Sequence, residues 1–156
     1  MRLNPIVEHT WLDYYQKLWT RQFNVNPTER KCAKLTENCV DLIIMEELET
    51  TIKALKARKS PGPDGSNNEL YKHAPKSFLH KFFNFLNVCW NYGDIPEDWR
   101  TAIVVAIHKS GDRNNPDNYR GISLLNTGYK IYSKVIAKKL TSITEVLLLE
   151  EQNGFR

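Results

Sequence analysis

The sequence lacks any apolar run close to the roughly 18 residues that a membrane-spanning helix needs. Its opening residues, MRLNPIVEHT, contain no apolar segment of the kind that a secretory signal requires. Cysteine is scarce, and the spacing of Cys32, Cys39 and Cys89 suits neither a disulfide framework nor a zinc site. These absences predict a soluble intracellular protein, cytoplasmic or nuclear, whose thiols are reduced.

An internal repeat, a low-complexity tract and a large excess of charge of one sign are also missing. Hydrophobic residues make up 41% of the 156 residues and charged residues 26%, which is typical of a globular domain with its own core. The net charge of +4 is compatible with nucleic-acid binding but is too small to indicate it.

Apolar residues recur at helical spacing in four stretches, which are residues 6–22, 45–57, 75–92 and 126–149. In the second stretch Met45, Leu48 and Ile52 lie on one apolar stripe, with acidic residues near its start and lysines near its end. Gly93 is predicted to end the third stretch. Residues 23–39 are polar and aperiodic, which predicts a linker.

Two strands are predicted in the second half of the chain. Residues 101–108, TAIVVAIH, are apolar and β-branched and predict a buried strand. After a loop of turn-forming residues, residues 119–124, YRGISL, alternate as the returning strand of a hairpin. We therefore predict an α+β fold, mainly helical with one β-hairpin. The expected core includes Phe78, Phe82, Trp90, Trp99 and the strand at residues 103–107.

The heptapeptide KSPGPDG, residues 59–65, is too rich in proline and glycine to be a helix or a central strand. Such a loop can hold an unusual backbone shape that aims N–H groups at phosphates, and Arg58 and Lys59 add positive charge. A rigid connector between two helices explains the same residues, and from the heptapeptide alone it is the favoured interpretation.

The predicted hairpin carries Lys109 at its tip and Arg120 on the returning strand. Together they could hold a triphosphate, because arginine binds it through two hydrogen bonds and lysine acts as a point charge. The alternative is a solvated hairpin whose charges prevent edge pairing, and this alternative is favoured when the hairpin is considered alone.

Considered together, four blocks in a fixed order favour the functional interpretation of the loop and the hairpin. The blocks are KSPGPDG, GDIPEDWRTAIVVAIHKSGD, NYRGISLLNTGYKIYSKVIAKKL and EEQNGFR. Together they resemble the opening motifs of the reverse transcriptase domain of non-LTR (LINE-like) retrotransposons, over about residues 45–156. The earlier VEHTWLDYYQKL resembles, more weakly, the linker before that domain. The resemblance implies a linker with one amphipathic helix at residues 1–40. Residues 41–156 would be a partial polymerase domain, the fingers and the start of the palm.

The resemblance also implies roles for particular residues. Lys109 and Arg120 match the family's contacts to the triphosphate of the incoming deoxynucleotide. The block that matches the template-facing region contains Arg58, Lys59, Pro61, Gly62, Asp64 and Gly65. Gln152, Gly154 and Phe155 match the start of a block that leads into the palm.

Family members have a palm whose aspartates, one on a strand and two in a tight turn, hold two metal ions. This sequence contains no FADD-like or YADD-like motif, and adjacent acids such as Glu46 and Glu47 would point about 100° apart on a helix. We therefore expect no catalytic or metal-binding residue here, no complete palm or thumb, and no activity of this chain alone. The complete enzyme is expected to need Mg²⁺, an RNA template, a DNA primer, a deoxynucleoside triphosphate and a palm-containing part.

Three functions stay open at this point. The chain is a fragment of an RNA-directed DNA polymerase, a nucleic-acid-binding module without catalysis, or a helical protein-interaction domain. The last would use the aromatic residues of the first helix, which are Trp11, Tyr14, Tyr15 and Trp19.

Overall fold

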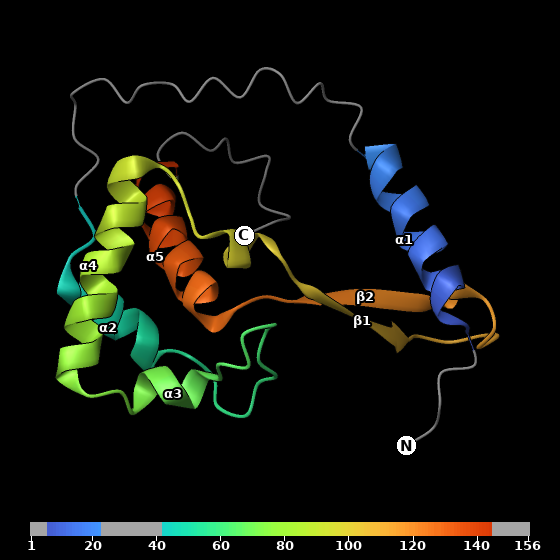
Figure 1. The fold of residues 1–156 in the computed structure, drawn as a ribbon, viewed down its shortest axis with the longest axis horizontal. Helices are drawn as coiled ribbons and strands as arrows, with labels where there is room; N and C mark the ends of the chain where they lie inside the picture. Colours follow the sequence, from blue (N-terminus) through green and yellow to red (C-terminus); the bar gives the residue numbers. More distant parts are fainter. Residues whose placement is uncertain (1–5, 23–41, 145–156) are drawn as a thin grey trace. The chain divides into compact units, whose positions relative to one another are not determined.

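The computed structural model describes residues 6–22 and 42–144. The elements along the chain are α1 (Glu8–Gln22), α2 (Met45–Lys53), α3 (Asn68–Lys72), α4 (Lys76–Tyr92), β1 (Ile103–His108), β2 (Tyr119–Leu124) and α5 (Thr127–Thr144) (Figure 1). Short 3-10 turns, η2 (Glu97–Arg100) and η3 (Pro116–Asn118), precede the two strands. The predicted α+β class is confirmed. The chain divides into two compact units, one with α2 to α5 and one with α1 and most of the hairpin.

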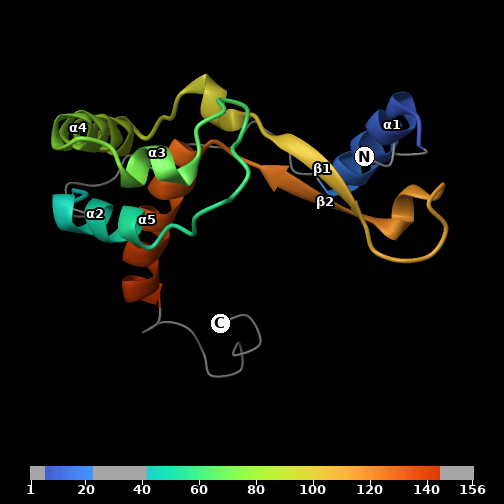
Figure 2. The ribbon, with the colours of Figure 1, turned by 90° about the horizontal axis from the view of Figure 1, so that it is seen from below.

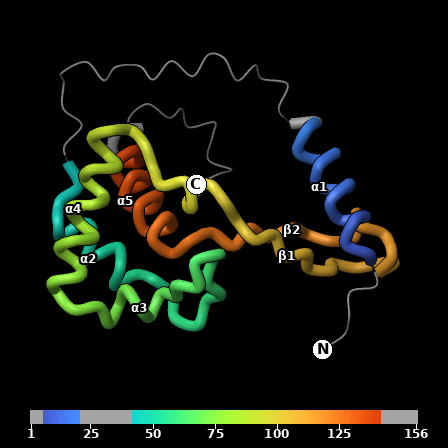
Figure 3. The backbone as a smooth tube through the Cα atoms, in the orientation of Figure 1, coloured from blue at the N-terminus to red at the C-terminus, as the bar shows by residue number. Residues whose placement is uncertain are grey.

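In the helical unit, α2, α4 and α5 enclose the core, and Figure 3 traces the backbone that connects them. The fully buried residues include Leu48 on α2, Leu86 on α4, and Ile131 and Val135 on α5. Burying each such side chain contributes about 1.5–3 kcal/mol. The helices follow the predicted spacing because their apolar stripes meet in this core.

Polar groups at the α2–α5 contact are paired. The buried hydroxyl of Thr51 accepts a hydrogen bond from Lys138 Nζ at 3.2 Å. Lys139 Nζ lies 2.9 Å from Glu47 Oε1. Cys89 is a free thiol in the same core, and burial raises the pKa of that thiol. Cys32 and Cys39 lie outside the described residues.

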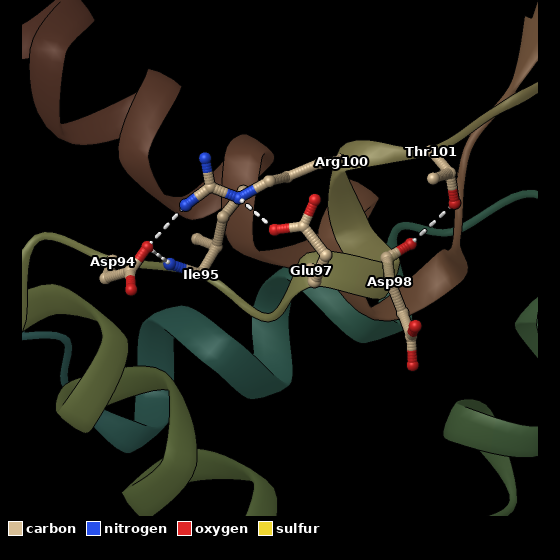
Figure 4. Close-up of polar contacts among 6 residues, drawn as sticks. All are labelled: Asp94, Ile95, Glu97, Asp98, Arg100 and Thr101. Atoms are coloured by element: carbon tan, nitrogen blue, oxygen red, sulfur yellow. Dashed lines mark hydrogen bonds and ion pairs between the residues drawn. The ribbon is translucent and has the colours of Figure 1, made fainter.

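Helix α4 ends where the sequence predicts, because Gly93 adopts a left-handed conformation with φ 65°. The turn that follows is held by Arg100, whose Nη2 lies 2.6 Å from Asp94 Oδ1 and whose Nε lies 3.2 Å from Glu97 Oε2 (Figure 4). The same turn places Trp99 on the core, beside the rings of Phe85, Tyr129 and Tyr132.

In the other unit, α1 packs on the hairpin (Figure 2). The Trp11 ring meets the Tyr119 ring edge to face, with centroids 4.9 Å apart. A Cβ at Gly121 would lie 2.8 Å from the hydroxyl of Tyr15, so glycine there lets the helix approach the strand. The predicted first helix and both predicted strands are confirmed.

The burial predicted for the first strand is wrong. Val105 and Ile107 are 39% and 49% exposed, because the sheet has two strands among the described residues and α1 packs on its other face. An apolar, β-branched run does not reveal whether one face or both faces of a strand are covered. Of the other expected core residues, Phe82 is buried, Trp90 and Trp99 are half-buried, and Phe78 is exposed.

Other differences concern where helices begin and end. Helix α2 ends at Lys53, four residues before its predicted end. The short helix α3 was not predicted, and it forms because the Asn67 side chain accepts a hydrogen bond from Leu70 N. The predicted end of α5, the predicted linker at residues 23–39 and residues 152–155 lie outside the described residues. Within the described part of the chain, no helix is both long and apolar enough to cross a membrane.

Candidate functional site

The loop between α2 and α3 is closed at its base by two adjacent residues of α3. Asn68 Nδ2 donates a 2.7 Å hydrogen bond to the carbonyl oxygen of Lys56. The backbone N–H of Arg58 donates a 2.6 Å hydrogen bond to Glu69 Oε1. Arg58 has φ 57°, which is the left-handed conformation. The loop therefore leaves α2 by a sharp reversal that α3 holds in place.

The middle of this loop packs against the backbone of Leu125 and Asn126. Gly65 N donates to Gly62 O at 3.1 Å, which closes a turn in which Gly65 has φ 69°. Gly62 is buried, and a Cβ there would lie 2.5 Å from both Leu125 O and Asn126 N. Only glycine fits this contact, because the facing atoms belong to backbone and cannot rotate away.

Two buried polar residues at the start of α5 fix the loop in place. Asn126 is 2% exposed, and its Oδ1 accepts a 3.2 Å hydrogen bond from Asp64 N while its Nδ2 donates to Asp98 O at 2.9 Å. Thr127 is 1% exposed and donates from Oγ1 to Ser66 O at 2.7 Å. Because buried polar groups without partners are costly, these bonds hold both the loop and the η2 turn against α5.

Neither Asn126 nor Thr127 stands out in the sequence as a site residue. Asn and Thr before an apolar helical stretch are the usual signal of a helix N-cap. In the structure their side chains instead reach across to other segments, which only the tertiary fold reveals.

The structure places all six residues of the predicted template-facing block in this one loop. Arg58 and Lys59 are exposed, and neither forms an ion pair with a residue that the structure describes. The Asp64 carboxylate accepts a hydrogen bond from Ser66 N at 3.1 Å, so it shapes the turn. The loop is thus both a rigid connector and a carrier of exposed positive charge.

Lys109 and Arg120 share one face of the hairpin. Lys109 N donates to Asn118 O at 2.8 Å, and this bond together with the strand limits sets Arg120 opposite Ile107. Side chains alternate between the faces of a sheet, so Ile107 and Arg120 point the same way. The same alternation, continued one residue past the end of β1, puts Lys109 on that face. Both cations are exposed, and within the described residues neither forms an ion pair.

The opposite face of the hairpin carries Tyr119 and Gly121, on which α1 packs. His108 is on this face too, and its ring lies 5.0 Å from that of Tyr119. The two faces therefore differ in role: one is covered by aromatic packing within the unit, and the other presents the two cations.

The acidic residues at the hairpin tip take part in local structure. Asp112 Oδ1 accepts a hydrogen bond from Asn114 N at 2.9 Å. Desolvation and the neighbouring Asp117 carboxylate raise the pKa of Tyr14. Among residues 6–22 and 42–144, no three His, Cys, Asp or Glu side chains gather as a metal site would require.

The fold and these two features define an α+β polypeptide that presents exposed basic side chains from a docked loop and from one face of a hairpin. The loop and the hairpin tip belong to different compact units. No model of a known protein family matches the sequence.

Individual proteins of transposable elements are similar to the chain. The chain is 35% identical to a probable RNA-directed DNA polymerase from transposon BS of Drosophila melanogaster, over 73% of this chain and 13% of that protein. It is 30% identical to the RNA-directed DNA polymerase from mobile element jockey of the same organism, over 73% of this chain and 13% of that protein. A putative 115 kDa protein in the type-1 retrotransposable element R1DM is 26% identical, over 92% of this chain and 14% of that protein.

The chain is therefore homologous to a segment of non-LTR retrotransposon RNA-directed DNA polymerases. It spans 13–14% of the length of these relatives, whereas they match most of its own length.

Proposed function

We propose that this chain forms part of the fingers of an RNA-directed DNA polymerase and contributes contacts to the incoming nucleotide and the template. The observation that carries the proposal is the common face of Lys109 and Arg120, which α1 leaves open. A guanidinium can bind a phosphate through two hydrogen bonds, and an ammonium adds a mobile point charge. Two such groups on one sheet face suit the triphosphate of a deoxynucleotide.

The docked loop is the proposed template contact. Its backbone is fixed by Gly62 and Asn126, while Arg58 and Lys59 stay exposed. Contacts to phosphates position a nucleic acid without reading its sequence, and a rigid loop makes them at little entropic cost. The proposed partners of the complete enzyme are an RNA template, a DNA primer and a deoxynucleoside triphosphate.

The catalytic chemistry is assigned to other parts of a complete polymerase. Bound Mg²⁺ would supply activation of the primer hydroxyl and stabilisation of the leaving pyrophosphate. The described residues do not fit such a site, since they bring no three carboxylates together. The proposed work of this chain is therefore binding and orientation of substrates, with a palm-containing part of the enzyme supplying the metal ligands.

A nucleic-acid-binding module without catalysis would use the same cations. The protein-interaction alternative is weaker for Trp11 and Tyr15, because they pack on Tyr119 and Gly121 of their own unit. Trp19 is 46% exposed and stays available for such a contact.

The nucleotide contact is tested by titrating the chain with a deoxynucleoside triphosphate and following backbone amide resonances. Lys109→Ala and Arg120→Ala are each expected to raise Kd about tenfold, the size of one charge-assisted hydrogen bond. Lys81→Ala removes an equal charge from the exposed side of α4 and is the matched control. Equal weakening by all three variants, or no binding by the unaltered chain, would refute this contact.

A further inference from the structure

The exit of the chain from α2 contains an uncommon backbone conformation. Among the described residues, Arg58 is the only one other than glycine with positive φ. The left-handed conformation is unfavourable for a residue with a Cβ, and glycine adopts it without that cost. Strain of this kind persists only where the surrounding structure holds it, and it is frequent at functional sites.

Glu69 holds Arg58 in this conformation. Its Oε1 accepts the 2.6 Å hydrogen bond from Arg58 N, and the neighbouring Asn68 holds Lys56 O. The bond to the backbone of Arg58, foremost among several causes, lowers the pKa of the Glu69 carboxyl. The carboxylate binds the backbone of Arg58 and leaves its guanidinium without an ion-pair partner among the described residues.

We propose that Glu69 is a positioning residue for the template: it fixes the left-handed backbone of Arg58 and thereby directs the Arg58 guanidinium, beside Lys59, at a phosphate of the RNA strand. This inference rests on the proposed function of the loop. It adds that an acidic residue strengthens the binding of a polyanion, which is the opposite of what net charge alone predicts.

Removing the negative charge of Glu69 and removing its hydrogen bond are expected to change RNA binding in opposite directions, so substitutions of Glu69 can distinguish the two effects. The probe is a single-stranded uridine oligonucleotide, and its binding to the full chain is measured over a range of salt concentrations. Glu69→Ala and Glu69→Gln both remove one negative charge, but only glutamine keeps an oxygen that can accept the hydrogen bond from Arg58 N. Glu69→Gln is expected to bind at least as tightly as the unaltered chain, with the same salt dependence.

Glu69→Ala is expected to bind about fivefold more weakly, because the guanidinium is no longer directed at a phosphate. The slope of log K against log salt should fall by about 0.7, which corresponds to one lost contact on a single strand. Hydrogen exchange at the Arg58 amide should become faster in Glu69→Ala and stay slow in Glu69→Gln. A merely structural role would change the exchange rate and leave the salt slope unaltered.

Arg58→Asn separates this inference from the function on which it rests. Asparagine tolerates the left-handed conformation but carries no charge. Arg58→Asn should lower the slope by the same amount, and Glu69→Ala should have no further effect in that background. If Arg58→Asn weakens binding and Glu69→Ala binds as tightly as Glu69→Gln, only the positioning role is overturned. If the unaltered chain does not bind the oligonucleotide, the template function fails and this inference fails with it.

Discussion

Asn126 and Asp64 lie 62 positions apart in the sequence, and the Asn126 side chain accepts a 3.2 Å hydrogen bond from Asp64 N. The same amide donates to Asp98 O, so one buried side chain joins the loop after α2, the turn after α4 and the start of α5. The position of the proposed template loop therefore depends on a residue that is not expected to touch the template.

Asn126→Ala removes both bonds and leaves Asp64 N and Asp98 O without this partner. We expect a loss of about 1–2 kcal/mol in the free energy of unfolding, since Asp98 O keeps its hydrogen bond from Thr101 Oγ1 and a lost hydrogen bond typically costs about 1 kcal/mol. Urea denaturation measures the loss. Asn84→Ala, at an exposed position of α4, is the control and should change stability by less than about 0.5 kcal/mol. Equal effects of the two substitutions would contradict the role given to Asn126.

Gly62 and Gly65 make a matched pair. Gly62→Ala places a Cβ against the backbone of Leu125 and Asn126, so the loop must move away from the start of α5. We expect the free energy of unfolding to fall by about 1–3 kcal/mol. Gly65→Ala has open space and pays only for its φ of 69°, about 1 kcal/mol. Hydrogen exchange at the Asp64 amide distinguishes them: it should become fast in Gly62→Ala and stay slow in Gly65→Ala. Slow exchange in both variants would argue against docking of the loop.

Trp11 and Leu12 are neighbours on α1 with different surroundings. Trp11→Ala removes the ring that packs on Tyr119 and should destabilise the α1–hairpin unit by about 2 kcal/mol. Leu12 is largely exposed, so Leu12→Ala should have little effect. Amide exchange in β1 and β2 should accelerate about 30-fold in the first variant only. The packing of α1 would be disproved if the strands exchanged equally fast in both variants.

The Glu69 carboxyl predicts a pH dependence. Its pKa is lowered from an ordinary value of 4.5 in the folded chain, so its contribution to stability is present above that value and is lost as pH falls through the folded-state pKa. The unaltered chain should be more stable than Glu69→Gln near neutral pH. In acid the difference between their melting temperatures should shrink towards zero. A difference that grows on acidification would have the wrong sign for this interaction.

Arg100 and Trp99 are adjacent, but their side chains should contribute very differently to the free energy of unfolding. The ion pairs of Arg100 with Asp94 and Glu97 lie in solvent, so Arg100→Ala should cost less than about 1 kcal/mol. Trp99→Ala removes a ring packed against Tyr129 and Tyr132 and should cost about 3 kcal/mol. Thermal unfolding of the two variants compares them, and a larger effect at Arg100 would refute this ranking.

The elements predicted best were those with a local signal. Helix α4 follows its apolar spacing and ends at Gly93, and the hairpin strands match their alternation. Burial was predicted poorly for β1, because the sequence of a strand does not state how many layers cover it. Helix α3 was missed because its cap, Asn67, lies in a run of polar residues that also suits a loop.

The residues of the candidate site also fall into two groups, those that the sequence predicted and those that only the structure revealed. Lys109 and Arg120 were chosen from motif order, and the strand register then places them on one face. Asn126, Gly62 and Glu69 act through contacts between residues far apart in the chain or through a single backbone angle. Neither kind of relationship leaves a pattern in a single sequence, so these contacts follow only from the fold, although Gly62 itself lies in the block that motif order had marked.

The bond from Asp64 to Asn126 also bears on how the protein is made. Ribosomes add about 5–20 residues per second, so the 62 positions between these residues take about 3–12 s to synthesise. During that interval the loop has already been synthesised, whereas the start of α5, against which the loop packs, has not. The nascent chain thus carries a basic segment without this contact, and the loop docks against α5 only after the start of α5 has been made.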